Sequence, residues 1–236
     1  MIIKNKINGI HLFQERNIKI RRKRKGRFRM AEEKTVEQFI AEQRDAIMRN
    51  PGCGMSHYNL ATGLLSLRQI EAAEREFHEA VRCSPSLAEA YVQLGGICLQ
   101  RGDLEGCLQY NQASIDARPR FAEGYGNIGF VHFQKGNIDK AIQFLEKAVN
   151  FNNMFIQAYA TLANAYLFKG LVDKSIETNL KALDIDAEFA VAHNNLAICY
   201  LEKGDYETAA AHCDRARSLG YAVPREILDE IEAHRK

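Results

Sequence analysis

Apolar, small and polar positions recur along this chain with a period of 34 residues, five times without a gap, from Gly54 to Val223. In each period a ring residue, a leucine or isoleucine and a small residue follow one another at positions i, i+3 and i+4, and a further apolar residue stands at i+7 in all periods but the third, which has His132. This is the stripe of an amphipathic helix. The ring column contains His57, Tyr91, Tyr125, Tyr159 and His193, and the small column contains Ala61, Gly95, Gly129, Ala163 and Ala197. A fixed period of this length is typical of stacked helix pairs. The pattern therefore predicts an all-α fold.

Each period divides into two helices joined by a short turn. The turn carries glycine in four of the five periods, at Gly102, Gly136, Gly170 and Gly204. Glycine predicts a left-handed cap there, because it lacks the Cβ atom that disfavours this conformation. The first period has Arg68 instead, so we expect its turn to be less well formed. Asp103, Asn137 and Asp205 follow the glycine and are expected to cap the second helix.

The second helices carry small residues in two columns, which allow helix backbones to approach closely. One column contains Ala73, Cys107, Ala141, Ser175 and Ala209, and the other contains Ala80, Ser114, Ala148, Ala182 and Ala216. The position between them is larger, and Asn111 and Asn179 occupy it in two periods. We expect these two asparagines to weaken the local packing.

These columns, recurring five times, resemble the tetratricopeptide repeat (TPR) family. The resemblance covers Gly54 to Val223 without an insertion, although no tryptophan opens any repeat and the last two repeats lack some of the usual residues. It implies a right-handed solenoid of antiparallel helix pairs whose first helices line a concave groove. Such arrays present a binding surface more often than a catalytic pocket.

The period also predicts the domain organisation. One step of 34 back from Pro85 gives Pro51, so Val36 to Arg49 has the phase of a second helix without its partner. Pro224 opens a final amphipathic segment, and proline is favoured in a first helical turn. We therefore expect four parts: a basic leader at 1–29, an N-terminal capping helix within 30–53, five repeats at 54–223 and a C-terminal capping helix at 224–236.

Charge separates the leader from the remainder of the chain. Residues 1–29 contain eleven lysines or arginines and one acid, whereas residues 30–236 contain 21 bases and 29 acids. The array is therefore a poor candidate for binding nucleic acid, which requires clustered bases. The leader lacks the apolar core of a secretory signal. It could be absent from the mature protein, with Met30 as the true start, or be a disordered basic arm or a targeting segment.

Signals for chemistry are sparse. No 18-residue apolar run, CxxC pair, Walker loop, GxGxxG, HExxH or GxSxG motif occurs. The histidines His57, His132 and His193 fall in structural columns, and the six cysteines are interpreted as small apolar residues in a reducing cytosol, with a Cys98–Cys107 disulfide as the less favoured alternative. No catalytic residue, cofactor or metal ligand is predicted.

The candidate binding residues are the positions of the first helices that lie outside the conserved columns. The residue before each conserved leucine or isoleucine is polar in all five repeats, namely Asn59, Gln93, Asn127, Thr161 and Asn195, and Asn164 adds another amide. An amide offers both a donor and an acceptor, which matches the backbone of an extended peptide. The row resembles the asparagine ladder with which some TPR superhelices hold a peptide main chain.

Apolar residues on the same helices would supply much of the affinity. Phe130 and Phe133 are the best central anchor, and Leu167 is a further candidate. The predicted peptide-binding set is Asn59, Gln93, Asn127, Phe130, Phe133, Asn164, Leu167 and Asn195. Two alternatives remain open: a solvated polar face, and a hydrophobic groove that binds a helix. No carboxylate clamp is recognisable, and Glu89 and Glu123 would repel an acidic tail.

The sequence thus predicts a cytoplasmic, non-enzymatic adaptor that binds an extended segment of a partner protein, in the assembly or regulation of a complex. One alternative is a factor that associates with nucleic acid or membrane through the basic leader. Another is a scaffold that assembles with copies of itself.

Overall fold

The structure is a computed structural model that describes residues 35–234, so the predicted leader at 1–29 lies outside the described residues. Every regular element in this range is an α-helix, which confirms the all-α prediction. Helix α2 spans Val36–Arg49 and α13 spans Arg225–His234. Between them lie α3 (Gly54–Ser66), α4 (Ile70–Cys83), α5 (Ala88–Gln100), α6 (Leu104–Ala117), α7 (Ala122–Gln134), α8 (Ile138–Phe151), α9 (Ile156–Phe168), α10 (Val172–Ile185), α11 (Ala190–Glu202) and α12 (Tyr206–Ser218).

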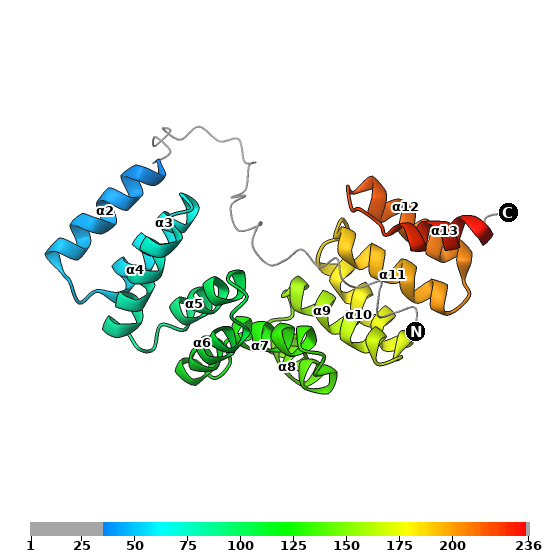
Figure 1. The fold of residues 1–236 in the computed structure, drawn as a ribbon, viewed down its shortest axis with the longest axis horizontal. Helices are drawn as coiled ribbons and strands as arrows, with labels where there is room; N and C mark the ends of the chain where they lie inside the picture. The colour runs from blue at the N-terminus through cyan, green and yellow to red at the C-terminus, as the bar shows by residue number, and fades with distance from the viewer. Residues whose placement is uncertain (1–34, 235–236) are drawn as a thin grey trace. The chain divides into compact units, whose positions relative to one another are not determined.

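The described chain forms two compact units, residues 35–124 and 125–234, with the division inside α7. Figure 1 shows the helices as consecutive pairs, such as α3 beside α4 and α11 beside α12. The first unit has a core that includes Leu60, Phe77 and Leu94, all at most 4% exposed. In the second unit Leu167 and Ile227, both fully buried, belong to the core. Each unit therefore buries the apolar stripes that the 34-residue pattern predicts.

The turns between paired helices share one hydrogen-bond motif. In the second repeat the N–H of Asp103 donates to the carbonyl of Cys98, 2.9 Å away, and Gly102 between them has a φ of +78°. This is a Schellman cap, which satisfies carbonyls at the end of the first helix. The first repeat closes the same way, from the N–H of Gln69 to the carbonyl of Leu64, yet its left-handed residue is Arg68 with a φ of +58°. The turn that was expected to be less well formed thus has the same geometry, with a residue that disfavours it.

The N-caps of the second helices follow the prediction in two repeats and depart from it in one. Asp103 accepts a hydrogen bond from the N–H of Gly106 at 2.8 Å, and Asp205 accepts one from the N–H of Thr208 at 3.1 Å. The prediction was wrong for Asn137, because it occupies the N-cap of α8 without a side-chain hydrogen bond to the helix. A cap residue therefore identifies where the helix starts, but it stabilises the helix only when its side-chain rotamer lets it accept a backbone hydrogen bond.

The buried asparagines of the second helices bond to their own helix. Asn111 and Asn179 are fully buried, and their Nδ2 atoms donate to the carbonyls of Cys107 at 2.8 Å and Ser175 at 3.0 Å. A buried amide without such a partner would cost about 1–3 kcal/mol. These donors are satisfied, so the repeats with asparagine still have closed cores.

A single helix closes each end of the described chain. Thr35 and Gln38 form a reciprocal capping box at the start of α2, which is the sequence signature of a helix N-terminus. Ile40 of α2 packs with the core of the first unit, and Ile227 and Ile231 of α13 pack with that of the second. Both terminal helices thus cover apolar surface that a repeat would otherwise expose.

Replacing Arg68 with glycine should stabilise the first unit. A left-handed conformation costs a side-chain-bearing residue about 1–2 kcal/mol, and glycine removes this cost. The greater freedom of glycine in the unfolded chain offsets about 0.5–1 kcal/mol of the resulting stabilisation. We expect Arg68→Gly to raise the free energy of unfolding by about 0.5–1 kcal/mol, measured by urea denaturation. The reverse change at the equivalent position, Gly136→Arg, should lower it by a similar amount. Loss of stability in Arg68→Gly would contradict this prediction.

Candidate functional site

The eight residues predicted to contact a ligand lie on first helices, and the structure divides them by exposure. Asn59 on α3, Gln93 on α5, and Asn127 and Phe133 on α7 are half-buried. The remaining four, Phe130, Asn164, Leu167 and Asn195, are at most 5% exposed. The half-buried residues are therefore those that present side-chain surface to solvent, whereas the buried ones pack inside the protein.

Two amides of the predicted row also hold their helix to the preceding second helix. Asn59 Nδ2 donates to Gln43 Oε1 at 3.4 Å, and Asn195 Nδ2 donates to Asn179 Oδ1 at 3.3 Å. Each bond spans 16 residues, so the same repeat position makes the same contact in both units. These amides join neighbouring repeats, a role that the sequence pattern alone does not distinguish from ligand binding.

Asn194, directly before Asn195 on α11, is an amide that lies outside the predicted set. It is 4% exposed, and its Oδ1 has no hydrogen-bond partner among the described residues. A buried acceptor without a partner costs about 1–3 kcal/mol, and such groups often mark functional sites. The signal for it in the sequence is the pair of consecutive asparagines, of which only the second fits the repeated row.

Glu89, which was expected to repel an acidic ligand, is paired with an arginine of the same unit. Arg118 donates two hydrogen bonds to the Glu89 carboxylate, at 2.7 Å and 3.0 Å. Burial acts to raise the pKa of Glu89, but the Arg118 hydrogen bonds, a backbone hydrogen bond and the Arg118 charge together outweigh it, and the pKa is lowered. Glu89 therefore stays ionised and paired, and it contributes less repulsion than an isolated carboxylate would.

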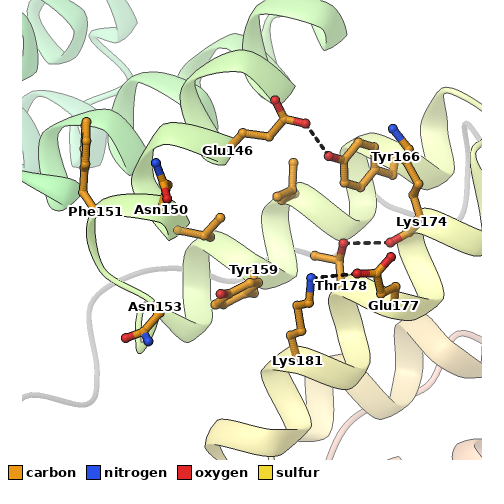
Figure 2. Close-up of a pocket in the computed structure, with 12 residues that line it drawn as sticks. Glu146, Asn150, Phe151, Asn153, Tyr159, Tyr166, Lys174, Glu177, Thr178 and Lys181 are labelled. Carbon is orange, nitrogen blue, oxygen red and sulfur yellow. Dashed lines mark hydrogen bonds and ion pairs between the residues drawn. The ribbon is translucent and has the colours of Figure 1, made fainter.

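The second unit contains a pocket of about 710 Å³ between α8, α9 and α10. Figure 2 shows Glu146 of α8 and Tyr166 of α9 pointing toward one another at one side, with Lys181 and Glu177 of α10 at the other. The floor and walls combine the rings of Tyr159 and Tyr166 with apolar and amide side chains. No residue of the predicted peptide-binding set lines it. Most of its lining residues come from the second helices α8 and α10, for which the sequence predicts only packing roles.

Hydrogen bonds arrange the polar groups of this pocket. The Tyr166 hydroxyl donates to Glu146 Oε1 at 2.5 Å, and the Lys174 ammonium lies 5.5 Å from the centre of the Tyr166 ring. Burial raises the pKa of Tyr166, and the hydrogen bond to Glu146 raises it further. The phenol therefore remains a donor at all ordinary pH values. The pocket presents a ring flanked by paired charges, which suits an amphipathic side chain of a partner.

Family models for the tetratricopeptide repeat match residues 58–120, residues 122–153 and 156–189, and residues 178–211. Together these matches cover more than half of the chain. The chain belongs to the tetratricopeptide repeat family. The antiparallel helix pairs are thus TPR units of a solenoid, and this fold supports a general role as a protein–protein interaction scaffold. No curated protein matches the chain in sequence.

Solved TPR structures share the fold at low sequence identity. YrrB, described as a TPR protein with an unusual peptide-binding site, is 19% identical, covers 81% of this chain and 96% of its own, and has a TM-score of 0.62. Pseudomonas aeruginosa pilF is 17% identical over 85% of this chain and 90% of its own, with a TM-score of 0.73. MamA from Desulfovibrio magneticus RS-1 is 25% identical over 71% and 94%, with a TM-score of 0.60.

Four of the six cysteines of this TPR protein are buried, as expected for small apolar residues. All six cysteines lie among the described residues and are free, so the alternative Cys98–Cys107 disulfide is not formed. Cys98, Cys107, Cys199 and Cys213 are buried, and burial raises the pKa of Cys107 to about 12 and that of Cys199 to about 11. Cys53 and Cys83 are half-buried. No helix in the described range is both long and apolar enough to cross a membrane.

The ring column of the TPR repeats begins and ends with a histidine, His57 and His193. In the fifth repeat, His193 Nε2 lies 3.2 Å from the carbonyl oxygen of Ala187, and His193 Nδ1 lies 3.0 Å from His212 Nδ1. A carbonyl only accepts, so Nε2 of His193 carries hydrogen and its Nδ1 accepts from His212. Burial lowers the pKa of His212, and the neighbouring His193 lowers it further. The folded protein therefore favours the neutral form of His212.

This histidine pair should make stability depend on pH. Because the folded pKa of His212 lies below the unfolded value of about 6.5, the unfolded chain binds more protons and stability falls as pH drops below that value. Replacing His212 with phenylalanine, the residue that Phe144 supplies at the equivalent position, keeps a ring against Tyr200 and removes the titration. Urea denaturation at pH 5 and pH 7 should show a smaller difference for His212→Phe than for the native protein.

The exposed His78 provides the matched control for this prediction. His78→Gln removes a histidine without touching the pair, so the loss of stability at pH 5 should match that of the native protein. An unchanged pH dependence in His212→Phe would show that the pair does not control it.

Proposed function

We propose that this TPR protein is a non-enzymatic adaptor that binds an extended segment of a partner protein along the exposed face of its first helices. The observation that carries the proposal is the recurrence of half-buried amides at one repeat position, Asn59 on α3, Gln93 on α5 and Asn127 on α7. An amide both donates and accepts, so it pairs with a peptide backbone whatever the side chains of the ligand. The role belongs in the cytoplasm, where the six free thiols stay reduced.

Helix spacing supports an extended ligand. Packed helices lie about 8–10 Å apart, and an extended chain advances about 3.3 Å per residue. Successive first helices that contact one another within one unit, such as α9 and α11, would therefore meet every third residue of the ligand. The description of YrrB as having a peptide-binding site accords with this use of the fold.

Aromatic surface supplements the amides. Phe133 is half-buried, and its ring makes an edge contact with Phe168 at 6.3 Å between centroids. Each hydrogen bond contributes only about 0.5–1.5 kcal/mol net, so apolar burial must provide much of the affinity. Phe133 is the exposed member of the predicted aromatic pair, since Phe130 is 2% exposed and packs inside. We therefore assign the direct aromatic contact to Phe133.

Two double variants, one in each unit, test the proposal. Asn59→Ala with Gln93→Ala removes two amides of the first unit, and Asn127→Ala with Phe133→Ala removes an amide and a ring around α7. Partners captured by the tagged native chain from a lysate of its own cells should be depleted at least about 10-fold in both variants, as expected for the loss of more than about 1.4 kcal/mol of binding free energy. Quantitative mass spectrometry provides the measurement.

Arg75→Ala with Gln112→Ala is the matched control, since both residues are exposed on second helices. Partners retained by the control and lost from both first-helix variants support the proposal. Circular dichroism must show equal helix content in all four proteins. Undiminished capture by both first-helix variants would exclude the face proposed.

A further inference from the structure

Three metal-ligating side chains meet in the first TPR repeat. His57 projects from α3, while Glu79 and Cys83 lie one turn apart on α4, and one ligand atom from each lies within 4.8 Å of the other two. His57 is 7% exposed, and Glu79 and Cys83 are half-buried. The cluster is therefore anchored in the core on one side and reachable from solvent on the other. It shares no residue with the predicted peptide-binding set.

The His57 ring is held in one orientation by a carboxylate. Its Nδ1 lies 2.7 Å from Glu76 Oε2, and the carboxylate accepts a hydrogen bond from it. In metal sites a histidine ligand usually donates its second N–H to such an acceptor, which fixes the tautomer and directs the other nitrogen at the metal. Glu76 is thus placed to leave His57 Nε2 as the coordinating atom.

A backbone carbonyl and a thiol lie beside His57 Nε2. This nitrogen lies 3.1 Å from the carbonyl oxygen of Pro51, and Cys83 Sγ lies 3.6 Å from the same oxygen. With the ring hydrogen on Nδ1, the Nε2 lone pair would face a carbonyl oxygen that only accepts. A proton or a metal cation at Nε2 removes that conflict. The metal is favoured because one ligand atom each of His57, Glu79 and Cys83 lies within 4.8 Å of the other two, beside the Pro51 carbonyl.

We propose that His57, Glu79 and Cys83 bind a divalent transition metal, with zinc as the best match, at the junction of α3, α4 and the Pro51 turn. Zinc accepts imidazole nitrogen, thiolate sulfur and carboxylate oxygen in a tetrahedral arrangement. The ligand atoms of such a site stand about 3.3–3.8 Å apart. Side-chain rotations of Cys83 and Glu79 that shift their ligand atoms by about 1 Å would close it. Water or the Pro51 carbonyl completes the four ligands.

The neighbouring charges are compatible with this site. The Arg82 guanidinium bonds to Glu79 Oε2 at 2.5 Å and 2.9 Å, which leaves Oε1 for the metal. Glu79 is 42% exposed at its side chain, so it can turn toward the cluster without breaking the core. Binding of the metal by a thiolate and a carboxylate neutralises a dication, and Glu76 balances the polarised imidazole.

The fifth repeat provides an internal comparison. His193 occupies the position of His57 and contacts the equivalent carbonyl, of Ala187, at 3.2 Å. Arg215 and Leu219, however, stand where the first repeat has Glu79 and Cys83. The fifth repeat thus has the histidine without the other ligands, and its second nitrogen contacts His212 instead of a carboxylate. The metal site is specific to the first repeat.

Cobalt(II) titration of the full chain tests the site directly, because thiolate-bound cobalt gives a charge-transfer band in the near ultraviolet. We expect one cobalt per chain, displaced by zinc, and no such band in Cys83→Ser. Cys53→Ser is the matched control: Cys53 is the other half-buried thiol, and hydrogen bonds from Ser56 lower its pKa, so it would bind cobalt more readily if exposure and acidity alone mattered. Its variant should retain the band.

A second variant tests the orientation of the imidazole. Glu76→Gln leaves all three ligands in place and should weaken zinc binding about 10–100-fold, as loss of an outer carboxylate does at other sites. Equal circular dichroism spectra and melting temperatures of the metal-free variants establish that each one folds. No charge-transfer band in the native chain, or an equal band in Cys83→Ser, would overturn the proposal.

Discussion

The structure depends on how closely its paired helices approach one another. The small column of the first helices faces the larger position of the second, and the backbones are near enough that a Cβ atom on Gly95 would lie 2.3 Å from the Asn111 amide. At Gly129 the same atom would lie 2.6 Å from Leu145 Cγ. Ala73, Ala80 and their equivalents are fully buried for the same reason. This contact determines the spacing of each pair, and the positions of all outward side chains follow from it.

A constant backbone frame lets single residues change the local chemistry. His57 and His193 occupy one repeat position, and both contact a carbonyl of the preceding connection. The residue opposite differs between the two: the Glu76 carboxylate accepts a hydrogen bond from the first imidazole, whereas His212 donates one to the second. The same repeat position therefore has a different hydrogen-bond partner in the first and the fifth repeat, without any difference in fold.

Much of the fold was predictable because local patterns and packing agree. The turn glycines and Arg68 all adopt the left-handed conformation, and Asp103 and Asp205 cap their helices as expected. Asn137 does not, although it occupies the same N-cap position. The candidate binding residues were less predictable. Asn195 bonds to Asn179 inside the protein, and periodicity cannot separate a polar residue that faces a ligand from one that faces the next repeat.

By itself the sequence determined the family, the helix pairs and the turns, since a 34-residue period repeated five times constrains backbone geometry at every step. Only the tertiary structure decided which side chains meet. His57 and Cys83 are 26 residues apart and have no motif spacing, yet the antiparallel pairing of α3 and α4 places them around one carbonyl. Exposure was decided in the same way, because burial of Phe130 and Leu167 depends on neighbouring helices, not on their own.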